Sequence, residues 1–324
     1  MILPYAARLV CLCFASFFLL HGFLGLAAWM SAPAATRAGE CMSPRTAARM
    51  LFSLRMLPAI LAAAAVAALC VPSYLRLEGN TAGERVGLWC CAAAILGLAI
   101  CADSLVRAAR AMWITASHSF RCKRGAQLVQ NSTTGAQIVV MDSESSLVAL
   151  TGMIRPRIVI SRAVFGALSS DELDAAVEHE RAHSKSHDNF KRLLLALAPE
   201  IFPFSRAFRA LERSWARYRE WAADDESVGG DSRRSLALAS ALVRVARMGT
   251  APVPPLASSL HDANDELSAR VERLLGAKKR VETVQRRNVM FATAAAAIAT
   301  GCLALALQPF TLYSVHVLLE RFIR

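Results

Sequence analysis

No cysteine lies between Lys123 and Gly301 of this 324-residue chain, although nine occur elsewhere. That stretch therefore has no disulfide framework and no thiolate metal site, as expected for a domain in the cytosol. Any metal ion bound there must be held by histidine and carboxylate. Acidic residues are also scarce, 25 against 37 lysines and arginines. No pattern of basic and aromatic residues supports nucleic-acid binding, so the net charge of +12 is expected to face anionic lipid headgroups.

Hydrophobic residues make up 55% of the chain and its mean hydropathy is +0.37, which describes neither an ordinary soluble domain nor a disordered chain. Four apolar stretches reach the roughly 20 residues that a membrane-spanning helix needs. They are residues 5–30, 50–72, 87–105 and 289–312. The region between the third and fourth stretches is polar and long enough for one domain with its own core. We therefore predict three spans within 1–106, a domain over 107–287, and a fourth span with a short external tail in 288–324.

Basic residues concentrate at both ends of the predicted domain. They are Arg107, Arg110, Arg121, Lys123 and Arg124 at the first end, and Lys278, Lys279, Arg280, Arg286 and Arg287 at the second. The positive-inside bias then places the domain in the cytoplasm and both termini outside the cell (inner) membrane. The alternative is that residues 1–35 form a cleaved signal peptide, but their apolar core is longer than the usual 7 to 15 or so residues.

Short β-branched runs separated by turn formers predict three strands, at 136–141, 146–150 and 157–161. Pro156 begins the third, which favours an edge strand because a missing N–H is best tolerated there. After Leu168 the pattern changes to helical spacing, and Ser169 with Glu172 forms a capping box. The predicted domain is therefore α+β with a small sheet, inside a mainly α polytopic membrane protein.

The helix that follows this capping box carries the sequence His179-Glu180-x-x-His183. Residues i and i+4 of a helix lie on one face about 6 Å apart along the axis, so both imidazoles can reach one ion. In this pattern two histidines bind zinc and the glutamate polarises a water molecule on the metal. The alternative is an exposed amphipathic helix whose polar face happens to carry histidine.

A catalytic zinc site needs a third protein ligand. The stretch 217–228, RYREWAADDESV, offers Glu220 and, one turn later on the same face, Asp224. A glutamate completes a His₂Glu set, and the aspartate can accept the second ring N–H of a ligating histidine. The alternative is a charged face in solvent, since the stretch carries further charged residues.

These motifs form an ordered set with Asp188, GMIRPRIVIS at 152–161 and LSARVERLL at 267–275. The set resembles the BlaR/MecR-type integral-membrane zinc metallopeptidases, and the resemblance covers nearly the whole chain. It implies three spans, a cytosolic zincin-like (gluzincin) domain and a fourth span. By this resemblance His179, His183 and Glu220 bind Zn²⁺, Glu180 acts as general base and then acid, and Asp224 supports a ligand.

Two features depart from that family. Its β-lactam sensors continue into an external penicillin-binding domain, whereas this sequence ends at Arg324, so we do not expect antibiotic sensing. His187 extends the histidine stripe by one turn, and we interpret it as a surface residue rather than an oxyanion partner. For the oxyanion itself, Tyr218, Arg155 and His187 stay open.

The expected function is a metalloendopeptidase that cuts a cytosolic regulator or itself, with an extended substrate paired to an exposed strand edge. One alternative is a quality-control protease similar to the HtpX/Ste24-type membrane metallopeptidases. Another is a membrane scaffold that transmits a signal without cutting. An intact Glu180 argues against the scaffold, because holding a metal does not require the base. The expected partners are a protein or peptide substrate, the bilayer and, as an open alternative, a second copy of the chain.

Overall fold

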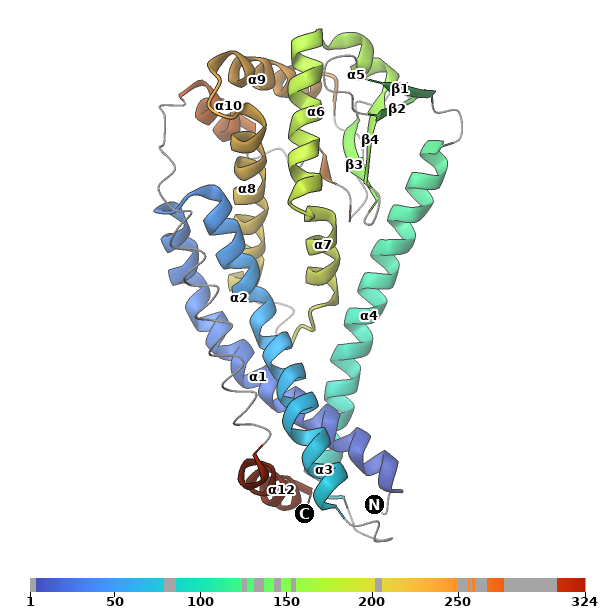
Figure 1. The fold of residues 1–324 in the computed structure, drawn as a ribbon, viewed down its shortest axis with the longest axis vertical. Coiled ribbons are helices and arrows are strands. Elements are labelled where there is room, and N and C mark those ends of the chain that lie inside the picture. The colour runs from blue at the N-terminus through green and yellow to red at the C-terminus, as the bar shows by residue number, and fades with distance from the viewer. Residues whose placement is uncertain are drawn as a thin grey trace.

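The computed structural model describes residues 4–78, 86–123, 127–130, 137–142, 147–152, 156–201, 206–249, 256, 258–259, 267–276 and 308–323. Long helices form one end of the molecule, and a small sheet with shorter helices forms the other (Figure 1). The N-terminus and the last helix lie together at the end opposite the sheet (Figure 1).

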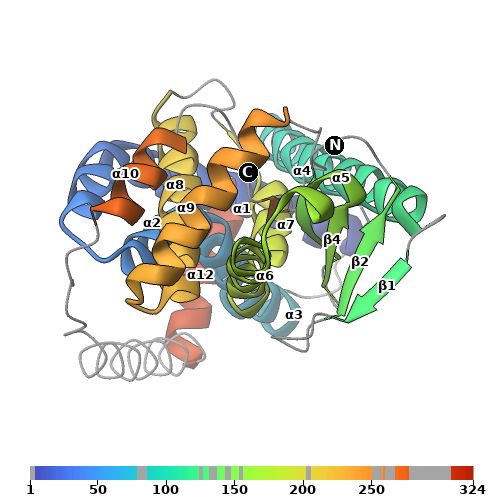
Figure 2. The ribbon, with the colours of Figure 1, turned by 90° about the horizontal axis from the view of Figure 1, so that it is seen from above.

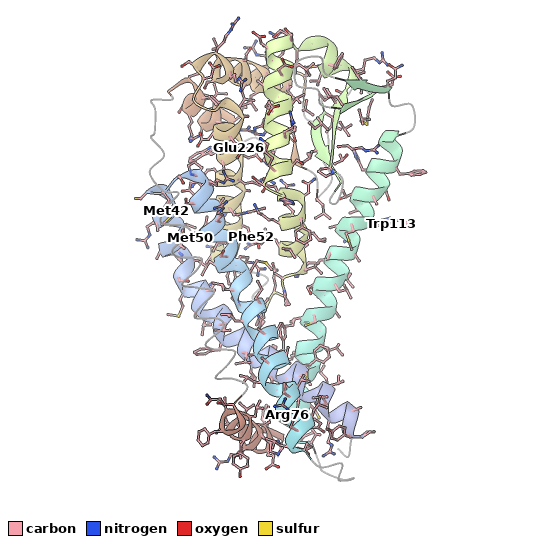
Figure 3. The ribbon with its side chains drawn as sticks, in the orientation of Figure 1. Met42, Met50, Phe52, Arg76, Trp113 and Glu226 are labelled. Carbon is pink, nitrogen blue, oxygen red and sulfur yellow. The ribbon has the colours of Figure 1, made fainter. Side chains whose placement is uncertain are left out.

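Three helical segments are long and apolar enough to cross a membrane. They are α1 (Tyr5–Glu40), α2 (Pro44–Ala65) with its continuation through a π-helical turn (Val66–Cys70) and α3 (Val71–Leu77), and α4 (Leu88–Lys123). The three stretches predicted as spans in this region are therefore helical, and the helices continue beyond residues 30, 72 and 105. Many of their large apolar side chains are exposed, such as Trp113, which points away from the molecule (Figure 3).

The sheet has the strand order β1-β2-β4-β3-β5. Its strands are β1 (Gln127–Gln130), β2 (Gln137–Met141), β3 (Val148–Thr151), β4 (Arg157–Ser161) and β5 (Ser258–Ser259). β2 and β4 are parallel, and the other neighbours are antiparallel. The three predicted strands are thus present as β2, β3 and β4. The edge position expected for the third is wrong, because β4 is central, and Pro156 is tolerated since it precedes the strand.

Alternate side chains along the strands point to opposite faces of the sheet, and both faces are buried. Ile138 and Val140 point into the main core, whereas Val139 and Met141 belong to a separate cluster on the other face. The main core also includes Ala176 and Val177 of α6.

The remaining helices are α5 (Arg162–Ala167), α6 (Ser170–Lys185), α7 (Asp188–Leu197), α8 (Arg206–Val228), α9 (Ser232–Arg247), α10 (Leu267–Leu275) and α12 (Pro309–Ile323). Seen from above, α6 lies between the sheet and the pair α8 and α9 (Figure 2). The N-terminal part of α8 packs on α1 and α2, where the ring centroid of Trp215 lies 6.2 Å from that of Phe52. This packing joins the helix that carries Glu220 to the membrane-type helices.

Most of the predicted fourth span, 289–312, lies outside the described residues. The chain after residue 312, predicted as a short tail, is helical to residue 323 as part of α12. Leu312 and His316 share the buried side of α12, and the Ser73 hydroxyl donates to the Leu312 carbonyl at 2.8 Å. These contacts pack α12 against α3.

Candidate metal centre

The helix α6 begins with the predicted capping box, which fixes where its later residues point. Ser169 Oγ accepts from the Glu172 amide, and Glu172 Oε2 accepts from the Ser169 amide. Glu172 also binds Ser240 and Arg244 of α9. The capping box and the contact with α9 hold the first turn of α6 in place. From there α6 runs through the middle of the domain, and its histidine face is buried rather than exposed to solvent.

The structure brings His179, His183 and Glu220 together. The two Nε2 atoms are 3.1 Å apart, and Glu220 Oε2 lies 3.5 Å from that of His179 and 3.6 Å from that of His183. One ligand atom from each of the three residues lies within 4.8 Å of the other two. All three residues are buried, so the charged solvent face considered for α8 does not describe Glu220.

The Nδ1 atom of each histidine lies close to a carboxylate. His179 Nδ1 lies 3.0 Å from Asp224 Oδ1, and His183 Nδ1 lies 2.7 Å from Asp188 Oδ2. A carboxylate that accepts a hydrogen bond from Nδ1–H keeps the proton on Nδ1 and so leaves Nε2 as the unprotonated, ligating nitrogen. Both Nε2 atoms point to the same place as Glu220, so the geometry suits a single ion.

Two arginines at this site were missed from the sequence. Arg270 of α10 donates to both oxygens of Asp224, at 2.6 and 2.9 Å, and lies 3.3 Å from Glu220 Oε2. Arg219 donates to the other oxygen of Glu220. Arg270 lies in the stretch LSARVERLL noted above. Because this stretch is far along the chain from α6 and α8, residue spacing could not predict the contact.

Burial and neighbouring charges shift the pKa values of the titratable groups at the site in opposite directions. Burial raises the pKa of Glu180 to about 7. Burial alone would lower the pKa of His183, but the Glu220 charge and the Asp188 hydrogen bond raise it to about 9. Burial alone would raise the pKa of Asp224, yet Arg270 and His179 lower it to about 2. The site therefore keeps Asp224 ionised and leaves Glu180 near its midpoint at neutral pH.

Polar side-chain atoms of His179 and Glu180 are left without hydrogen bonds among the described residues, Nδ1 in His179 and both oxygens in Glu180. Both carboxylate oxygens of Glu180 are buried. Oε2 of Glu220, which faces the two imidazoles, also lacks a hydrogen bond among the described residues. Buried carboxylates without partners are costly. Two imidazoles and a carboxylate are ligands that zinc accepts, so the donor set fits such an ion.

A cavity of about 150 Å³ adjoins this cluster. Its lining includes His183, Asp188, Leu150 of β3, and His187 with Phe190. Asn189 donates to the carbonyls of Leu150 and Gly152, which fixes α7 against β3. β3 also pairs with β5 at Ala149 and Leu150, so along those two residues the exposed edge expected for substrate is wrong.

The oxyanion candidates are less closely associated with the site. His187 is exposed, has a left-handed φ of 55° and contacts the Lys185 carbonyl, in agreement with a surface residue that lines the cavity. Tyr218 is buried in the cluster that joins α8 to α1 and α2. Arg155 lies outside the described residues.

Comparison with known proteins agrees with the resemblance drawn from the motifs. The family model described as BlaR1 peptidase M56 matches residues 77–274, which is more than half of the chain and includes every residue of the cluster. None of the curated proteins compared with the chain matches it. The chain therefore belongs to the BlaR1 peptidase M56 family and is a membrane-associated peptidase.

Proposed function

We propose that the protein is a zinc metalloendopeptidase whose ion is held by His179, His183 and Glu220. The observation that carries this proposal is the convergence of three buried ligand atoms, within 4.8 Å of one another, beside a buried carboxylate that has no hydrogen-bond partner among the described residues. When bound, zinc would act as a Lewis acid that polarises the scissile carbonyl and acidifies water.

Glu180 is the group suited to move the proton. A general base works best when its pKa lies near the working pH, and burial raises that of Glu180 to about 7. Its carboxylate would accept a proton from the attacking water and then deliver it to the leaving amine nitrogen. A nearby cation favours the ionised form of Glu180, which prepares it as the base before the reaction.

Asp224 and Asp188 would orient the two imidazoles rather than contact the substrate. Asp188 Oδ2 lies 2.7 Å from Nδ1 of His183, and Asp224 Oδ1 lies 3.0 Å from Nδ1 of His179, so each carboxylate would fix the direction of one Nε2 lone pair. Arg270 and Arg219 would offset the excess negative charge of the carboxylates.

The substrate we propose is an extended segment of a cytosolic regulator or of the chain itself, which gives the protein a regulatory role. The basic residues that flank the domain support a cytoplasmic orientation. The cavity beside His183 is large enough to take a side chain of such a segment.

The test compares wild type with Glu180→Gln in the native host. Gln keeps the size of the side chain but cannot take a proton. We expect proteins that shorten with wild type to stay intact with Glu180→Gln, as measured by mass spectrometry of membrane and cytosolic fractions. Identical fragments in both strains would support the scaffold alternative instead.

A further inference from the structure

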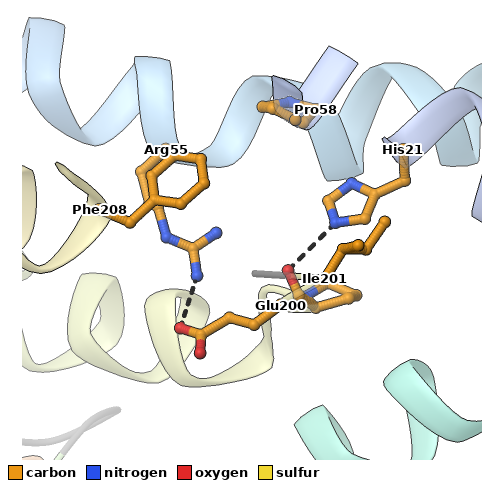
Figure 4. A pocket seen from close by; sticks show the side chains of 8 residues that line it. His21, Arg55, Pro58, Glu200, Ile201 and Phe208 are labelled. Carbon is orange, nitrogen blue, oxygen red and sulfur yellow. Dashed lines mark hydrogen bonds and ion pairs between the residues drawn. The ribbon is translucent and has the colours of Figure 1, made fainter. Parts of the chain in front are cut away.

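Three membrane-type helices hold the same short segment, residues 198–201, which follows α7. His21 of α1 donates from Nε2 to the Pro199 carbonyl at 3.1 Å. Arg107 of α4 donates to the Ala198 carbonyl at 3.0 Å, and Arg55 of α2 donates to Glu200 at 2.9 Å. Figure 4 shows His21 and Arg55 converging on this segment across a small cavity. We call residues 198–201 the α7 anchor.

Arg55 is the centre of this contact. It is 3% exposed, and a second hydrogen bond of 2.9 Å joins its Nε to Glu212 of α8. Its guanidinium also lies 5.3 Å from the ring centroid of Phe208. A buried arginine on a helix of this apolar kind is costly unless it is paired, and such residues commonly have a functional role.

Both carboxylates that Arg55 holds lie on elements that continue to the metal centre. Glu200 belongs to the α7 anchor, and α7 begins with Asp188, whose Oδ2 lies 2.7 Å from Nδ1 of His183. Glu212 is on α8, two turns before Glu220 on the same helix. One guanidinium of α2 therefore links the helices that orient His183 and carry Glu220.

We propose that Arg55, assisted by Arg107 and His21, is a positioning residue for the metal centre. The membrane helices set the relative placement of α7 and α8, and these helices set how His183 and Glu220 face each other. This inference rests on the proposed function. Through the ion pairs of Arg55, a movement of α2 would change catalysis although α2 does not touch the substrate. The alternative is that the cluster only stabilises the helix bundle.

The test uses the full chain in detergent with Arg55→Lys, which keeps the charge but removes the two-pronged contact. Arg49→Lys is the matched control, because Arg49 is an exposed arginine of the same helix. With fluorescently labelled casein we expect kcat to fall about tenfold in Arg55→Lys with KM unchanged, and no change in Arg49→Lys.

A double-mutant cycle separates positioning from stability. If Arg55 acts through α7, its effect on kcat should largely vanish in a background of Asp188→Asn, because contacts in one network are not additive. Additive effects of the two substitutions on kcat would overturn the proposal.

Hydrogen exchange gives a readout that does not need activity. In the metal-free protein we expect faster amide exchange across residues 188–197 in Arg55→Lys, with exchange in α9 unchanged. If wild type neither binds zinc nor cuts casein, the proposed function fails while this measurement still tests the contact. Equal exchange of α7 in Arg55→Lys and Arg49→Lys would overturn the positioning role alone.

Discussion

Arg270 donates two parallel hydrogen bonds to Asp224, from Nη2 to Oδ1 at 2.6 Å and from Nε to Oδ2 at 2.9 Å. This fork joins α10 to α8, although the two residues are 46 positions apart. Asp224 in turn contacts Nδ1 of His179. A planar guanidinium fixes a carboxylate more firmly than a point charge does, so α10 sets the orientation of the imidazole.

Replacing Arg270 by methionine should destabilise the fold and weaken zinc binding. The change leaves Asp224 and Glu220 buried with less positive charge, and breaking one side of such a pair costs about 3 to 5 kcal/mol. Thermal denaturation of the metal-free protein measures this loss. The double variant Arg270→Met with Asp224→Asn should recover part of it, and a double variant as unstable as the sum of the single ones would contradict the pairing.

Asp188→Ala should lower the affinity for zinc by about 10- to 100-fold, because His183 loses the group that fixes its tautomer. Competition with a chelating dye measures that affinity. Asp225→Ala serves as the control, since Asp225 of α8 makes an exposed ion pair with Arg273 at 2.7 Å. If the two variants bind zinc equally well, Asp188 does not orient a ligand.

The burial of Glu180 should make the metal-free protein less stable as pH rises. Its pKa is about 7 in the fold against 4.5 for the free group, so the folded state binds more protons between these values. Stability should therefore fall by up to about 1.4 kcal/mol per pH unit from this group, and level off above pH 7. Melting curves at pH 5 to 6.5 for wild type and Glu180→Gln measure the difference. A parallel pH dependence in both would refute the assignment.

The contact between α1 and α4 leaves no room for a side chain at Gly97. A Cβ atom there would lie far inside van der Waals contact of the Phe14 carbonyl oxygen, which is backbone and cannot rotate away. Gly97→Ala should therefore separate the helices and lower the melting temperature in detergent. Gly25→Ala on α1 is the control, because a Cβ there meets nothing within 4 Å. Equal melting temperatures would show that the helices do not approach so closely.

Local sequence signals predicted the elements that carry the site. The capping box at Ser169 fixed the start of α6, and helical spacing alone placed His179 and His183 on one face. The strands were found from β-branched runs, yet the central position of β4 was not, because strand order depends on pairings between distant segments.

The contacts that complete the site come from tertiary packing. Arg270 reaches Asp224 only because α10 packs on α9, and nothing in its own neighbourhood distinguishes it from other arginines. Nothing in the sequence around Arg55 pairs it with Glu200 and Glu212, and these contacts form only because α7 and α8 pack beside α2. Sequence patterns thus predict which residues share a helix face better than which helices meet.

The most direct test of the account is the zinc content of purified full-length variants, measured by elemental analysis after dialysis. We expect one zinc per chain in wild type and in Glu180→Gln, and a large loss in His179→Ala and Glu220→Ala. Retention of stoichiometric zinc by His179→Ala or Glu220→Ala, or its absence from wild type, would contradict a metal centre built from these residues.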